Sequence, residues 1–385
     1  MHVLILGARA PACLEWARVF DAAGWRVTVA DSLAWPLARA SRAAHGFLRL
    51  PEPRRSPARW TEAIAQAVRR EGITLVLPTC EEAFYLSHGR DRIPCRVFTS
   101  GFALMHRLHH KGWFAEMTRG WPVQAPTTVL LRSPADLAPL RAASRDWVFK
   151  PAYSRFATQT LIRPAPPRLD AVRPTEAQPW VAQRFVAGRE HCSYSLLVDG
   201  RVTAHACYHP RYRVGRGSGI WFEPTDPAPV RALVERLGAE TGYTGQLAFD
   251  VIEAADGRCH VLECNPRATS GVHLLGGRPE ALVAALLGEG GERGTEVLGG
   301  DGAPRAVALA MLLFAAPRHG LTRRFWRDYA VAADVVTRPG DRGPLPAQWL
   351  GLAEVTGRAL ARGIGLLPAA TADIEWDGQP MDERA

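Results

Sequence analysis

The stretch Leu247-Ala-Phe-Asp-Val-Ile-Glu253 is followed, after Ala254-Ala-Asp-Gly257, by a second apolar run that ends in Glu263-Cys-Asn265. An Asp-Gly dipeptide between two runs of alternating side chains is a strong β-hairpin signal. Two registers are open. A two-residue loop at Asp256-Gly257 places Asp250 opposite Glu263, and a four-residue loop over 254–257 places it opposite Val261.

Side chains alternate across a strand, so positions 261, 263 and 265 are predicted to share one face, with Leu262 and Cys264 pointing the other way into packing. Either register adds Asp250 to that face. Asp250, Glu263 and Asn265 would then offer two carboxylates and an amide oxygen. Oxygen-only ligation suits Mg²⁺, with Mn²⁺ as an alternative. A solvated acidic face is the competing interpretation.

The chain of 385 residues contains only two lysines, Lys111 and Lys150, and one asparagine, Asn265. Arginine carries the rest of the basic charge. A compact ammonium or an uncharged carbonyl ligand is therefore expected to be needed at these three positions.

Residues 1 to about 100 are predicted to form a parallel, doubly wound sheet. Apolar runs at Val3–Gly7, Trp25–Ala30, Ile73–Pro78 and Arg96–Thr99 are separated by segments of helical periodicity. Ligands of such sheets bind beyond the carboxyl ends of the strands. Glu81 or Glu82, at one such end, is a candidate to receive a cationic amine, and an acidic residue at the start of a helix is the competing interpretation.

The order of the motifs resembles the ATP-grasp family, in its carbamoyl-phosphate-synthase-like branch. Asp250…Glu263-x-Asn265-x-Arg267 matches the magnesium signature of the family in spacing and strand context, and Lys150-Pro-Ala-Tyr-Ser-Arg155 is similar to that branch. The resemblance covers residues 1 to about 290. It implies an N-terminal parallel α/β domain over 1–100, an ATP-grasp domain of two α+β subdomains over 101–290, and a C-terminal extension over 291–385.

The resemblance also implies an ATP site. Lys111 and Lys150 would contact phosphates, Arg267 would stabilise the transferring phosphoryl group, and Lys150 and Arg267 would be catalytic. The remaining nucleotide contacts would come from Gln183, Phe185 and Val186 at the adenine hinge, from Glu190 at the ribose, and from Arg155 in a phosphate loop that lacks the usual glycines.

The implied activity is an ATP- and magnesium-dependent ligase that activates a carboxylate as an acylphosphate and transfers it to an amine or a thiol. Arg211 and Arg213 are candidates to clamp the carboxylate, and Ser270 to line the acceptor pocket. A carrier-protein-bound acyl group and a homodimer remain open. An oxidoreductase that binds NAD(P) is an alternative, although Gly7-Ala-Arg-Ala-Pro-Ala12 lacks G-x-G-x-x-G. A nonenzymatic nucleotide-binding protein on the same fold is another.

Composition narrows the partners. The formal charge of +9 comes from scattered arginines without interleaved aromatic residues, so no nucleic-acid partner is expected. Seven cysteines without a C-x-x-C motif indicate neither zinc nor a disulfide framework. Met1–Gly7 has no basic leader and later apolar runs are short, so a cytoplasmic protein without a membrane anchor is expected.

Overall fold

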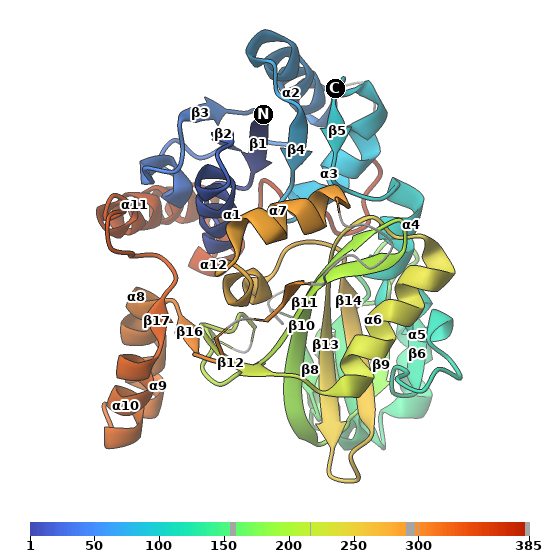
Figure 1. Ribbon diagram of the computed structural model, residues 1–385. Coiled ribbons are helices and arrows are strands. Elements are labelled where there is room, and N and C mark those ends of the chain that lie inside the picture. The colour runs from blue at the N-terminus through green and yellow to red at the C-terminus, as the bar shows by residue number, and fades with distance from the viewer. Residues whose placement is uncertain (155–158, 216, 290–296, 300, 382–385) are drawn as a thin grey trace.

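A computed structural model describes residues 1–154, 159–215, 217–289, 297–299 and 301–381. The N-terminal part contains a parallel sheet in the order β3-β2-β1-β4-β5 (Figure 1). Its strands are β1 (His2–Leu6), β2 (Arg26–Asp31), β3 (Gly46–Arg49), β4 (Leu75–Leu77) and β5 (Arg96–Val97). The predicted doubly wound sheet is confirmed, with β3 as a strand that the sequence analysis did not anticipate.

Helices cover both faces of this sheet, which explains why β1 is apolar at almost every position. Val3 and Ile5 join one apolar cluster with residues of α1 (Pro11–Ala22), whereas Leu4 and Leu6 join another with residues of α2 (Pro57–Glu71). α3 (Glu82–Gly89) and α4 (Phe102–His109) follow β4 and β5.

Two further sheets follow along the chain, and their strands pair antiparallel except for β11 with β15 and β16 with β17. The smaller has the order β6-β9-β7-β8 and the larger β14-β13-β10-β11-β12-β16-β17, with β15 beside β11. Their bounds are β6 (Thr128–Leu131), β7 (Trp147–Pro151), β8 (Leu161–Ile162), β9 (Trp180–Arg184), β10 (Gly188–Val198), β11 (Arg201–Pro210), β12 (Trp221–Thr225), β13 (Gly245–Ala254), β14 (Cys259–Asn265), β15 (Val297–Leu298), β16 (Arg305–Ala306) and β17 (Ala333–Asp334). The helices of this part are α5 (Lys111–Met117), α6 (Ala228–Thr241) and α7 (Pro279–Leu287).

The β13–β14 hairpin has the pairing that places Asp250 opposite Glu263, but through a third geometry. Glu253 pairs with Cys259 and Val251 with Val261, and the register shifts by one residue between Asp250 and Val251. This β-bulge changes the side-chain alternation. The prediction that Val261 shares the face of Glu263 and that Leu262 points into packing was therefore wrong: Val261 is buried in the core, and Leu262 lines the cavity described below.

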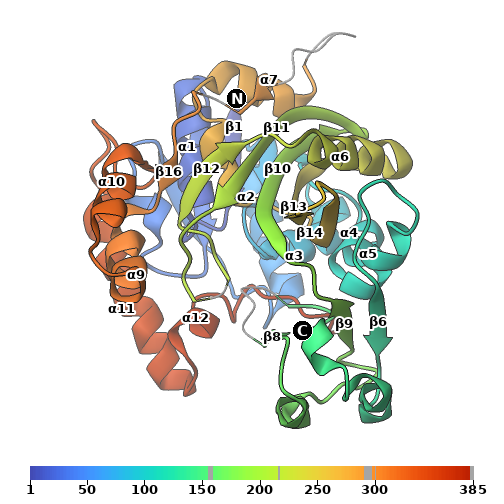
Figure 2. The same ribbon diagram turned by 90° about the horizontal axis from the view of Figure 1, so that it is seen from below.

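The C-terminal residues form helices along one flank of the molecule, beside the parallel sheet and the end of the larger sheet (Figures 1 and 2). They are α8 (Ala308–Ala310), a π-helical turn (Met311–Ala315), α9 (Ala316–His319), α10 (Arg323–Val331), α11 (Pro344–Arg362) and α12 (Leu366–Ala369). Val335 and Val336 share a core cluster with β1 and α1, so this segment packs against the N-terminal sheet. Among the described residues, no helix is both long and apolar enough to cross a bilayer.

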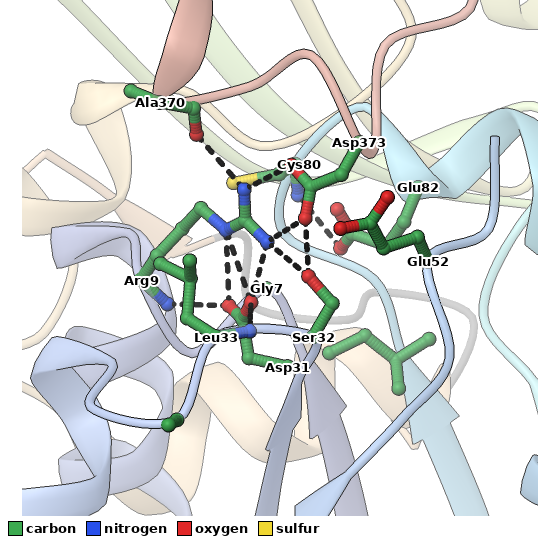
Figure 3. Close-up of polar contacts among 12 residues, drawn as sticks. Gly7, Arg9, Asp31, Ser32, Leu33, Glu52, Cys80, Glu82, Ala370 and Asp373 are labelled. Carbon is green, nitrogen blue, oxygen red and sulfur yellow. Dashed lines mark hydrogen bonds and ion pairs between the residues drawn. The ribbon is translucent and has the colours of Figure 1, made fainter. Parts of the chain in front are cut away.

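A buried ion-pair network fastens the C-terminal segment to the parallel sheet. Figure 3 shows the Arg9 guanidinium between two carboxylates, with its Nη2 2.5 Å from Asp31 Oδ1 and its Nη1 2.6 Å from Asp373 Oδ1. Arg9 also donates to the Ala370 carbonyl at 2.8 Å and to Ser32 Oγ at 2.9 Å. Burial alone would raise the pKa of Asp373, but Arg9 and Ser32 outweigh it and hold that pKa at about 2.

Asp373→Asn should destabilise the fold by on the order of 3 kcal/mol, because it leaves a buried guanidinium short of one carboxylate. The pKa of Asp373 is depressed below its usual 3.8, so its contribution is complete above about pH 4 and disappears as the pH falls toward 2. Urea unfolding at several pH values should therefore show a wild-type advantage that shrinks over that window. Asp377→Asn, in the exposed pair with Arg54, is the control and should change stability by less than about 1 kcal/mol. Equal effects of the two substitutions would contradict the role of the network.

Candidate active site

A cavity of about 820 Å³ lies where the carboxyl ends of the parallel strands, the smaller and larger sheets and the C-terminal helices meet. Residues from all four parts line it, from Arg9 and Glu81 through Lys150, Glu190 and Asp250 to Leu352. Its size falls within the range of about 300–1,000 Å³ that is typical of small-molecule sites.

Three oxygen-bearing side chains of the β13–β14 hairpin open into this cavity, namely Asp250, Glu263 and Asn265. Asn265 Nδ2 donates to Asp250 Oδ2 at 3.2 Å. Burial raises the pKa of Asp250, and the neighbouring carboxylate of Glu263 raises it further. Two carboxylates and an amide in one buried place match the ligand chemistry of a divalent cation, and such a cation would favour the charged form of Asp250.

Both lysines of the chain approach Glu263. Lys111 Nζ, at the start of α5, lies 3.3 Å from Glu263 Oε2, and Lys150 Nζ, on β7, lies 3.8 Å from the same oxygen. Burial opposes the charge of Glu263, but the two ammonium groups outweigh it and lower its pKa to about 2. Burial also lowers the pKa of Lys150 to about 8, and Glu263 limits that fall. Lys150 therefore remains mostly protonated at neutral pH.

The two lysines differ in what they face. Lys150 lines the cavity, and its Nζ donates to Gln183 Oε1 at 3.1 Å and to the Leu262 carbonyl at 3.3 Å. Lys111 is not among the described lining residues, and its Nζ donates to the Ser154 carbonyl at 2.9 Å. In this arrangement Lys111 lies behind Glu263, where it neutralises that carboxylate.

The end of β9 contributes the residues predicted for the adenine hinge. Gln183, Phe185 and Val186 all line the cavity, together with apolar side chains such as Val148 and Ile252. The Phe185 N–H donates to the Asp146 carbonyl at 2.8 Å, so that group is already engaged. Gln183 acts through its side chain, which supports Lys150.

Two further predicted residues, Glu190 and Arg213, form an ion pair in the cavity wall. Glu190 comes from β10 and Arg213 from the segment after β11. Cys192 lies on the same strand face as Glu190, and its Sγ donates to Asp250 Oδ1 at 3.0 Å. Glu190, Cys192 and Asp250 bring potential ligand atoms to within 4.8 Å of one another. The sequence analysis did not anticipate Cys192, although its position two residues after Glu190 places it on the same face.

Arg267 reaches the cavity from the segment that follows β14. Its Nε donates to Glu81 Oε1 at 2.6 Å, and its Nη2 donates to Asn265 Oδ1 at 3.2 Å. Glu81 follows β4, so this pair joins the β13–β14 hairpin to the carboxyl end of the parallel sheet. Ser270 lines the cavity nearby.

Two predicted substrate residues lie elsewhere. Glu82 is not among the described lining residues; it is buried, and its Oε1 accepts the Thr79 and Cys80 N–H groups at 2.9 Å each. One oxygen of its carboxylate thus binds N–H groups at the start of α3, and the side chain lies outside the described cavity lining. Gly7 allows the close approach here, because it has φ 77° and a Cβ would lie 2.9 Å from Glu82 Oε1.

Arg211 also differs from its predicted role. Its Nη1 lies 3.0 Å from Asp328 Oδ2 and its Nη2 3.0 Å from Glu223 Oε2, and its guanidinium stacks over Trp221. It joins α10 to β12 and is not among the described residues that line the cavity, so the structure gives no support for a substrate clamp by Arg211. The predicted phosphate-loop residue Arg155 lies outside the described residues.

No family model and no curated protein matches the chain by sequence. Solved structures do match. N5-carboxyaminoimidazole synthetase from Staphylococcus aureus complexed with ADP superposes with a TM-score of 0.63 at 12% identity, covering 89% of this chain and 91% of that one. L-amino acid ligase from Bacillus licheniformis gives 0.59 at 16% identity, over 74% and 75% of the two chains. Phosphoribosylamine–glycine ligase from Thermotoga maritima gives 0.59 at 17% identity, over 79% and 78%.

These similarities establish the fold. The chain has the ATP-grasp fold preceded by a parallel α/β sheet, as the resemblance implied.

Glu263→Gln and Asp250→Asn should each weaken Mn²⁺ binding by at least about 10-fold, because each removes a charged oxygen ligand. The electron paramagnetic resonance signal of free Mn²⁺, titrated with protein and a non-hydrolysable ATP analogue, measures this affinity. Glu253→Gln is the matched control. Glu253 lies on β13, as Asp250 does, but its carboxylate bonds to His191 at 2.9 Å and it is not among the described cavity-lining residues. Unchanged Mn²⁺ affinity in Glu263→Gln would exclude the predicted ligand set.

Proposed function

We propose that the protein is an ATP- and magnesium-dependent ligase that activates a carboxylate as an acylphosphate and joins it to an amine. One observation carries the proposal: Asp250, Glu263 and Asn265 converge with Lys150 and Arg267 in one cavity of an ATP-grasp fold. The printed names of the structural neighbours describe ligases and synthetases, and some of those structures contain ADP. A thiol acceptor is a second possibility within the same chemistry.

In the proposed reaction a substrate carboxylate oxygen attacks the γ-phosphorus of ATP, the bond to the bridging β–γ oxygen breaks, and ADP leaves. The amine then attacks the acylphosphate carbonyl, phosphate leaves with its electron pair, and the amine proton is released. Catalysis of this kind rests on positioning and on charge stabilisation. Mg²⁺ held by Asp250, Glu263 and Asn265 would supply charge neutralisation at the phosphate oxygens.

The residues of the chain have distinct tasks in this proposal. Lys150 and Arg267 stabilise the charge of the transferring phosphoryl group. Gln183 positions Lys150, and Glu81 positions Arg267, through the contacts at 3.1 Å and 2.6 Å. Phe185 and Val186 border the adenine, and Glu190 holds ribose hydroxyls in exchange for part of its contact with Arg213.

The alternative of an oxidoreductase that binds NAD(P) has no support in the geometry. A dinucleotide site would use the acidic residue at the end of β2 to bind ribose. That residue, Asp31, accepts hydrogen bonds from Arg9 and from the Leu33 N–H, and so its carboxylate is engaged. A nonenzymatic nucleotide-binding protein would not need the cation-ligand set together with Lys150, and the assay below distinguishes it.

Lys150→Ala should lower the rate of product formation by on the order of 10²–10³, because one charge-stabilising donor is lost. ADP release is measured with Mg²⁺ and ATP across a matrix of carboxylates and amines, and the products are identified by mass spectrometry. Arg132→Ala is the control, since Arg132 is an exposed cation that pairs with Glu176 outside the cavity. ADP release that needs both substrates and is lost only in Lys150→Ala would establish the ligase. Magnesium-dependent ATP binding without turnover would favour the nonenzymatic alternative or a carrier-bound substrate.

A further inference from the structure

The C-terminal segment presents one uncharged face of α11 to the cavity. The α11 residues that line it are Ala347, Gln348, Gly351, Leu352 and Val355. Their spacing of i, i+1, i+4, i+5 and i+8 places them on a single side of the helix. α11 therefore contributes a continuous strip of mainly apolar side chains to the same cavity that contains Lys150 and Asp250.

Two other C-terminal helical segments repeat this arrangement. Leu309, Ala310, Leu313 and Phe314 line the cavity at the spacing i, i+1, i+4 and i+5. The residues at 366, 367, 370 and 371 do the same. Fifteen described lining residues lie between positions 307 and 371, and within that described set none is charged and only Gln348 and Thr371 carry polar side chains.

A further part of the wall, next to α11, comes from the loop after β2, which contributes Leu33, Trp35 and Leu37. This loop is held against α11. The carboxylate of Glu354 accepts the N–H groups of Ala34 and Trp35 at 2.9 Å each. The loop after β2 and α11 are therefore fixed relative to each other by hydrogen bonds from backbone N–H groups to the Glu354 side chain.

The charged side chain at the edge of these walls is already neutralised. Arg9 lines the cavity, but its guanidinium is held by Asp31 and Asp373, and its side chain is only 9% exposed (Figure 3). His273, also in the lining, bonds through Nδ1 to the buried Glu15 at 2.9 Å. A substrate carboxylate or ammonium would find no unpaired charge among these groups, whereas an apolar group would lose no polar contact there.

We infer that this apolar compartment, bounded by α11, α12, the 309–314 segment and the loop after β2, binds an aliphatic or aromatic group of one of the two substrates that are ligated. The inference rests on the proposed function for the identity of the reaction and names the class of substrate. Burial of apolar surface drives the binding, and the reacting end of the substrate extends toward the charged part of the same cavity, where a carboxylate would face Arg267 and Lys150 and an amine would face Asp250.

Equilibrium binding tests the compartment without turnover. Straight-chain carboxylates from acetate to octanoate, and amines from ethylamine to octylamine, are titrated by calorimetry in the presence of a non-hydrolysable ATP analogue. Affinity in one of the two series should rise by about two- to fourfold per methylene, as expected for burial of CH₂ groups. The responding series identifies whether the carboxylate or the amine carries the apolar group. Affinity that does not depend on chain length in either series overturns the inference.

Substitutions locate the binding. Leu352→Asp should weaken octyl binding by at least about 10-fold and leave two-carbon ligands unchanged, because only the long chain reaches the wall. Val355→Thr, which is nearly isosteric, should produce a smaller loss in the same direction and serves if Leu352→Asp fails to fold. Leu360→Asp is the matched control, since Leu360 lies on α11 but is 80% exposed and does not line the cavity. Equal losses in the Leu352 and Leu360 variants overturn the inference.

The two proposals fail in different ways. Chain-length-dependent binding that is sensitive to Leu352, with no ADP release for any pair of free substrates, would retain the apolar compartment and remove the ligation of free carboxylates to free amines. ADP release that is supported equally by short polar and long apolar substrates would retain the ligase and remove the compartment.

Discussion

The arrangement around Glu263 depends on one electrostatic constraint: its buried carboxylate is held by the two lysines of the chain. Lys111 on α5 and Lys150 on β7 approach the same oxygen of Glu263, which lies on β14. These ion pairs connect α5 and the smaller sheet to the larger sheet. A carboxylate taken out of water is stable only when its charge is compensated. On the neighbouring strand, burial and the carboxylate of Glu263 raise the pKa of Asp250, and Arg213 only partly offsets that rise. The lysines therefore compensate Glu263 more completely than the surrounding cations compensate Asp250.

The ion-pair network of Arg9, Asp31 and Asp373 determines which residues line the cavity near the parallel sheet. Arg9 stands at the carboxyl end of β1, where the ligands of parallel α/β sheets are usually found. Asp31 and Asp373 both form ion pairs with its guanidinium. Because Asp373 belongs to the C-terminal segment, these ion pairs hold that segment against the carboxyl end of the sheet. Consequently Arg9, at a position where an arginine could bind an anionic ligand, holds the C-terminal segment in place. That segment contributes the mainly apolar lining of the cavity. The charged centre and the uncharged wall belong to one cavity, and their separation gives the two ends of a substrate different environments.

Sequence patterns were sufficient where the physics is local and periodic. The strands of the parallel sheet, such as His2–Leu6, and the hairpin that brings Asp250 onto the same strand pair as Glu263 both follow from the spacing of apolar residues and from the Asp-Gly turn, although that spacing left the register of the hairpin open. Sequence patterns were insufficient where the orientation of a side chain depends on a β-bulge or on a partner that is distant in sequence. The bulge beside Asp250 exchanged the orientations of Val261 and Leu262. Glu82 accepts hydrogen bonds from N–H groups of its own turn, and Arg211 forms an ion pair with Asp328, which lies far along the chain. Neither partner could be read from the local sequence. The C-terminal segment lines the cavity and packs against the parallel sheet through contacts with residues distant in sequence, and no local sequence pattern predicts such contacts.

The pairing of the cavity's charges constrains how the proposed reaction begins. Lys150 is near Glu263, Arg267 is paired with Glu81, and Arg213 with Glu190, so three of the cations proposed or predicted to contact ligands already have carboxylate partners. An anionic nucleotide alone would compete with those carboxylates and repel them. A divalent cation shared with Asp250 and Glu263 would relieve this repulsion and allow Lys150 to turn from Glu263 to a phosphate. Metal and nucleotide are therefore expected to bind with positive coupling, because each makes the charge environment of the other more favourable.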